Sequence, residues 1–126
     1  MKNYIEEAKV TDVQNYGAVQ ERCVDHKTLK ILHGAIGLST ESGEILDCIK
    51  KHLFYGKPLD LVNLKEELGD IFWYCALLAG ELGITFDEVQ DVNIQKLRAR
   101  FPNKFNEYDA THRDIEKERY ILEGRN

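Results

Sequence analysis

Large apolar residues recur along most of the chain at helical spacing, and the alternation typical of strands is nearly absent. The longest such segment runs from about Thr28 to Leu53. Its large aliphatic residues gather on one side, at Leu29, Leu32, Ile36, Ile45, Ile49 and Leu53. A second segment runs from about Leu61 to Leu82, and a third ends near Arg100. The pattern therefore predicts an all-α protein.

Residues that start and stop helices separate these segments. Gly56 and Pro58 end the first long helix, and Asp60 is placed to cap the next one. Thr85 and Glu88 have the spacing of a capping box at the start of the third. The connections are short, and long helices joined by short connections pack as antiparallel neighbours. We therefore expect an antiparallel bundle of four to five helices.

The two ends of the chain are less regular. A first segment, about Asn3 to Arg22, is uneven, and Thr11 with Gln14 is a possible capping box for its second half. Pro102 prevents easy continuation of the third long helix. The charged stretch from about Ala110 to Glu123 is predicted to form a last helix.

Composition limits the classes of function. The chain has 126 residues, 43% of them apolar, which suits one folded domain. Its net charge is −5, whereas a protein that binds nucleic acid or a membrane surface is expected to have a basic face. Its three cysteines form no Cys-x-x-Cys pair. The first residues contain no apolar signal core, and no run approaches the ~20 apolar residues of a membrane span. We therefore expect a cytoplasmic protein with reduced cysteines, and neither nucleic acid nor membrane as a partner.

Two acidic motifs lie inside the long helices. Glu41-x-x-Glu44 is in the first, and Glu67-x-x-Asp70, preceded by Glu66, is in the second. Residues three apart on a helix project to the same side, so each motif directs two carboxylates one way. In an antiparallel hairpin the two pairs can face each other. Four such carboxylates would repel one another unless they held a cation, and their oxygens suit Mg²⁺ or Mn²⁺.

A single acidic pair on a helix more often belongs to a solvated face, and the local context decides against that interpretation. Both motifs adjoin apolar runs. Gly37, Gly43 and Gly69 interrupt the helix interiors, where glycine costs up to ~1 kcal/mol relative to alanine, so we expect them to permit close approach. A di-iron bundle would require Glu-x-x-His motifs, and no histidine follows a glutamate by three.

The third long helix carries polar and cationic residues on one stripe. Asn93, Lys96 and Arg100 are spaced so that they share a face. Such a row alone is usually solvated, but beside a carboxylate–metal cluster it becomes a candidate phosphate clamp.

These residues stand in a familiar context. The stretches GLSTESGEILDCIKKHLFYGKPLD, EELGDIFWYCALLAGELGITFDEV and NIQKLRARFP resemble the MazG-like superfamily of all-α nucleotide pyrophosphohydrolases, over about Lys30 to Pro102. The tail RFPNKF followed by THRDIEKERYILEG looks like a subgroup common in phage and bacterial genomes. The resemblance implies one domain over residues 1–126, with its core at about 28–102 and a helical tail at 103–126.

The resemblance also assigns roles. Glu41, Glu44, Glu67 and Asp70 match the family's magnesium ligands, with Glu67 as ligand or as general base. The substrate-binding positions follow from the same match, with Arg100 added from the stripe: Asn93, Lys96, Arg100, Lys51 and Tyr74. Trp73 is expected in the core rather than at the nucleobase.

The implied activity is Mg²⁺-dependent hydrolysis of a nucleoside triphosphate to the monophosphate and pyrophosphate. Two alternatives are phosphoribosyl-ATP hydrolysis and a helical module that binds nucleotide or a partner without turnover. The apolar faces are large for so short a chain, so we expect a homodimer or homotetramer.

Overall fold

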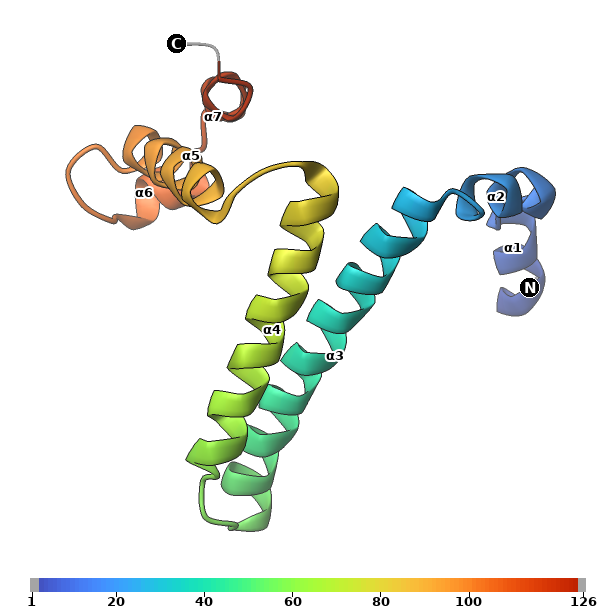
Figure 1. Cartoon of the computed structure of the whole chain (residues 1–126), viewed down its shortest axis with the longest axis horizontal. Helices are drawn as coiled ribbons and strands as arrows, with labels where there is room; N and C mark the ends of the chain where they lie inside the picture. Colours follow the sequence, from blue (N-terminus) through green and yellow to red (C-terminus); the bar gives the residue numbers. More distant parts are fainter. Residues whose placement is uncertain (1–2, 125–126) are drawn as a thin grey trace. The chain divides into compact units, whose positions relative to one another are not determined.

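The computed structural model describes residues 3–124, and within them every regular element is a helix (Figure 1). The chain divides into two compact units, with the boundary between Leu78 and Ala79 inside the fourth helix. The helices are α1 (Tyr4–Thr11), α2 (Tyr16–Cys23), α3 (His26–Tyr55), α4 (Leu61–Leu82), α5 (Phe86–Arg100), α6 (Glu107–Thr111) and α7 (Ile115–Leu122). The all-α prediction is confirmed, whereas the single-domain organisation stays a prediction.

Helices α3 and α4 form an antiparallel hairpin in the first unit (Figure 1). Asp25 caps α3, and Gly56 ends it with a φ of 66°, a left-handed conformation that glycine adopts without strain. The Asp60 carboxylate accepts hydrogen bonds from the backbone N–H groups of Val62 and Asn63, as predicted for the cap of α4. This hairpin carries both acidic motifs.

Two glycines bring α3 against α4. A Cβ atom added at Gly37 would lie 2.2 Å from the Tyr74 ring, and one at Gly34 would lie 2.7 Å from the Leu78 side chain. Both glycines are buried. The expectation of close approach is confirmed for Gly37 and wrong for Gly43 and Gly69, since a Cβ at either would have no neighbour within 4 Å.

The hairpin leaves much apolar surface uncovered. Among the described residues of the hairpin, the buried apolar ones are small: Gly34, Gly37 and Cys48. Large side chains of both helices are exposed: Leu29, Leu32, Ile36, Leu53, Phe54, Leu68, Phe72 and Trp73. The expectation that Trp73 packs in the core of its own chain is wrong, because it is 57% exposed.

The N-terminal segment is two helices, and its predicted capping box is wrong. Thr11 is the last residue of α1, where its hydroxyl donates to the Glu7 and Ala8 carbonyls. The side chain of Asn15 caps α2 by accepting from the Ala18 N–H. Thr11 is itself part of α1, and α2 begins only at Tyr16, so Thr11 does not occupy the position that caps α2.

In the second unit, Thr85 and Glu88 form the predicted capping box of α5. The predicted last helix is broken into α6 and α7, because Asp114 caps a new helix by accepting from the Lys117 N–H. Helix α7 packs against α5.

No single helix of residues 3–124 is long and apolar enough to span a membrane. Helices α4 and α5 reach that length and composition only when taken together across the break between them.

Candidate metal and nucleotide site

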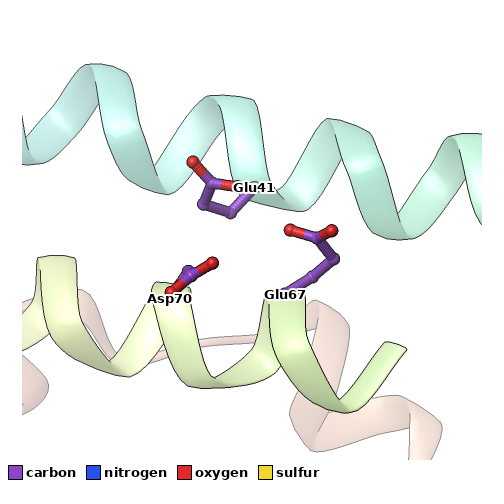
Figure 2. Close-up of side chains that lie close together, drawn as sticks. All are labelled: Glu41, Glu67 and Asp70. Atoms are coloured by element: carbon purple, nitrogen blue, oxygen red, sulfur yellow. The ribbon is translucent and has the colours of Figure 1, made fainter. Parts of the chain in front are cut away.

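Three of the four predicted metal ligands come together between α3 and α4. Glu41 extends from α3, and Glu67 and Asp70 extend from α4 toward it (Figure 2). One carboxylate oxygen of each residue lies within 4.8 Å of the others. The one-turn spacing of Glu67 and Asp70 places both on the side of α4 that meets α3.

Glu67 is the most enclosed member of this cluster. It is only 7% exposed, and the Asn63 side-chain amide donates a 2.6 Å hydrogen bond to its Oε1 atom. Burial raises the pKa of Glu67, and the neighbouring Glu41 and Glu44 carboxylates raise it further, against the lowering effect of the Asn63 hydrogen bond. Burial and the neighbouring carboxylates thus both oppose ionisation of Glu67.

The donor set fits a divalent cation that prefers oxygen ligands. Carboxylates are the usual protein ligands of Mg²⁺, Mn²⁺ and Ca²⁺. Two oxygens that bind the same ion at ~2.1 Å lie at most about 4.2 Å apart, so small side-chain rotations bring Glu41, Glu67 and Asp70 within range. A bound cation would also relieve the repulsion that raises the pKa of Glu67.

Glu44 is outside this three-carboxylate cluster, although its charge reaches Glu67. Its side chain is exposed and borders a cleft of about 490 Å³ at the closed end of the hairpin. The cleft also adjoins Lys51, Asn63 and Glu66. The fourth predicted ligand therefore lies between the cluster and an open cleft.

Lys51 lines this cleft and pairs with a neighbouring carboxylate, while its contact with substrate stays a prediction. The Asp47 carboxylate pairs with Lys50 and also with Lys51, at 2.7 Å. The two lysines lower the pKa of Asp47 to about 2, with the Lys50 hydrogen bond contributing most. Asp47 thus pairs with a lysine that borders the cleft.

Tyr74 lies one helical turn beyond Asp70, with its ring over Gly37. It contacts His33 edge-on, at 5.7 Å between ring centroids, and Trp73 at 4.9 Å. Tyr74 is half-buried in the helix interface next to the carboxylate layer. Its contact with nucleotide stays a prediction.

The predicted phosphate clamp is on α5 in the second unit. Asn93 is exposed and lines an apolar groove of about 480 Å³, and Lys96 is half-buried. Arg100 has a partner that the stripe did not reveal. Its guanidinium binds both oxygens of the buried Glu118, at 2.8 and 2.7 Å, and Arg113 binds the same carboxylate. Substrate contacts for Asn93, Lys96 and Arg100 stay predictions, and for Arg100 they would require sharing or leaving Glu118.

Sequence reasoning did not identify Asn63, Asp47 or Glu118. Asn63 and Asp47 had a readable signal, because each is four residues before the group it bonds, Glu67 and Lys51. Glu118 had no such signal, since it is 18 residues from Arg100 and in a different helix.

Known proteins share this sequence pattern. The family model described as the MazG nucleotide pyrophosphohydrolase domain matches residues 33–105, more than half of the chain. The Gene 37 protein of Mycobacterium phage L5 is 38% identical over 72 residues, which cover 52% of this chain and 60% of the phage protein. No solved structure matches this chain. The matched region contains the whole α3–α4 acidic cluster, and the chain belongs to the MazG nucleotide pyrophosphohydrolase domain family.

Proposed function

We propose that this chain is a Mg²⁺-dependent pyrophosphohydrolase of nucleoside triphosphates. The observation that carries the proposal is the meeting of Glu41, Glu67 and Asp70 between two helices, in a chain of the MazG family. The family suggests nucleotide pyrophosphohydrolase activity, and the all-oxygen donor set favours a hard cation. Water would cleave the anhydride bond between the α- and β-phosphates and release nucleoside monophosphate and pyrophosphate.

Glu41, Glu67 and Asp70 would hold the cation, and Glu44 would complete the ligand set from the border of the cleft. We place Glu67 among the ligands rather than as general base, because it is buried and directs one oxygen toward the other two carboxylates (Figure 2). When bound, a divalent cation supplies charge that polarises phosphoryl oxygens and eases deprotonation of the attacking water.

Cationic side chains would neutralise the phosphates. Lys51 lines the cleft and pairs with Asp47. The resemblance assigns triphosphate contacts to Lys96 and Asn93. Fixed positive charge near departing pyrophosphate stabilises the transition state, and this electrostatic term dominates phosphoryl transfer. Tyr74, one helical turn beyond Asp70 on α4, would contact the nucleotide.

Pyrophosphate release from standard and modified nucleoside triphosphates, measured with and without Mg²⁺, tests the proposal. Asp70→Asn keeps the side chain's shape but removes one ligand charge. We expect at least a hundredfold loss of turnover, equivalent to ~3 kcal/mol. We also expect a smaller metal-induced rise in melting temperature.

Lys96→Ala is the matched variant, because it alters a phosphate contact and no metal ligand. It should weaken turnover and leave the metal-induced melting shift unchanged. Near-normal pyrophosphate release by Asp70→Asn would contradict the carboxylate assignment and favour a module without turnover. Pyrophosphate release from phosphoribosyl-ATP alone would instead support the alternative activity, phosphoribosyl-ATP hydrolysis.

A further inference from the structure

We propose that Asn63 is a positioning residue of the metal site, which holds the Glu67 carboxylate in the orientation that binds the cation. This inference rests on the proposed function, because it assumes that Glu67 is a ligand. It assigns a role to a residue outside the two acidic motifs.

The Asn63 side chain contacts the Glu67 carboxylate directly. The two residues are four apart on α4, and the Asn63 Nδ2 atom donates to Glu67 Oε1 at 2.6 Å. The Asn63 backbone is fixed in turn, since its N–H donates to Asp60 Oδ1 at 3.0 Å in the capped first turn. Glu67 is buried and Asn63 is half-buried at the edge of the cleft, so the carboxylate end of the bond is shielded from solvent.

A carboxylate with one oxygen held by a donor has less freedom to rotate. Figure 2 shows one Glu67 oxygen directed toward Glu41 and Asp70. The Asn63 amide holds Oε1 of the same carboxylate, so it would limit rotation of the group that faces the cluster. Residues that orient metal ligands in this way typically contribute 10–100-fold to metal affinity or activity.

An amide also suits the charge of the site. Asparagine donates without carrying charge, so it leaves the negative charge of the carboxylates for the cation. A lysine at the same place would neutralise part of that charge and weaken cation binding.

The test compares Mn²⁺ binding to the intact chain without nucleotide, by titration calorimetry or by electron paramagnetic resonance of free Mn²⁺. Asn63→Ala removes the donor, Asn63→Leu removes it while keeping similar volume, and Asn63→Gln retains a donor. We expect Mn²⁺ Kd to rise at least tenfold for the alanine and leucine variants and by less than about threefold for the glutamine variant.

Asn103→Ala is the matched control, because Asn103 is exposed in the second unit and should give wild-type Kd. Alanine favours helix over asparagine, so a merely structural role of Asn63 would change the melting temperature and leave the Mn²⁺ Kd unchanged. Wild-type Kd in the alanine and leucine variants would overturn the inference. Equal losses in the leucine and glutamine variants would overturn the hydrogen-bond explanation.

The failure of this inference differs from failure of the proposed function. A wild-type chain that releases pyrophosphate while the Asn63 variants bind Mn²⁺ normally refutes only the role of Asn63. A wild-type chain that neither binds Mn²⁺ nor releases pyrophosphate refutes both.

Discussion

Substitution of Gly37 by alanine is the most direct test of the packing that brings the acidic motifs together. Gly37 is one turn before Glu41 on α3, and it lies under the ring of Tyr74, one turn after Asp70 on α4. An added Cβ would lie 2.2 Å from Tyr74 Cε1, where ordinary contact begins at 3.4 Å. The ring or the whole of α4 must therefore move by about 1 Å, since packed interiors have little free space.

Two opposing effects set the magnitude. Overpacking typically destabilises by about 1–3 kcal/mol, and replacing glycine by alanine inside a helix stabilises by up to ~1 kcal/mol. Gly43→Ala isolates the second effect, because Gly43 is in the same helix and a Cβ there would meet no atom within 4 Å. The helix contribution cancels in the comparison, so Gly37→Ala should be less stable than Gly43→Ala by about 1–3 kcal/mol.

Urea denaturation of both variants at one protein concentration measures this difference. A titration with Mn²⁺ adds a second readout, because a displaced α4 separates Asp70 from Glu41 and should raise the metal Kd for Gly37→Ala only. If the two variants have equal stability and equal Kd, then Gly37 is not a point of close contact, and the account of how the hairpin positions the site is wrong.

Two further predictions concern charge and assembly. The hydrogen bonds from Arg100 and then Arg113 lower the pKa of Glu118 from its ordinary 4.5 to about 2, so this ion pair stabilises the fold above pH 4.5 and its contribution is lost as the pH falls toward 2. Glu118→Gln should therefore lower the melting temperature at pH 7 and make the decrease in melting temperature between pH 5 and pH 3 smaller than in the wild type. An unchanged dependence of melting temperature on pH would show that the pair contributes little. The exposed apolar residues of α3 and α4 lead us to expect a homodimer or homotetramer, and sedimentation showing a folded monomer at low micromolar concentration would contradict this.

Local signals allowed much of the hairpin to be predicted. Asp60 and Gly56 mark a helix start and a helix end through short-range backbone chemistry. The observed α4, Leu61–Leu82, has the bounds predicted from the sequence. The ends of the chain were harder because several polar residues competed for the same caps. Thr11 had the right spacing for a capping box, yet α1 extends to Thr11 itself and Asn15 caps α2.

The site was predictable where spacing within a helix determines direction. The two acidic motifs and a short connection suffice to bring Glu41, Glu67 and Asp70 together. Glu44 is farther out, because helical spacing fixes a direction but not the path of a long side chain. The pairing of Arg100 with Glu118 depends on how α7 packs on α5, which spacing within one helix does not determine. Trp73 is large and apolar yet exposed, so apolar character alone does not decide whether a side chain is covered.

The hairpin's successive contact layers restrict changes in chain length. Gly34 meets Leu78, Gly37 meets Tyr74 and Glu41 meets Asp70, so packing and ligand positions share one register along α3 and α4. One residue inserted between Gly37 and Glu41 would turn everything beyond it by about 100°. The glycine contacts and the acidic cluster could then no longer face α4 together. Insertions are therefore more tolerable between the two caps, Gly56 and Asp60, than between these layers, which makes helix length as much a requirement of the site as its carboxylates.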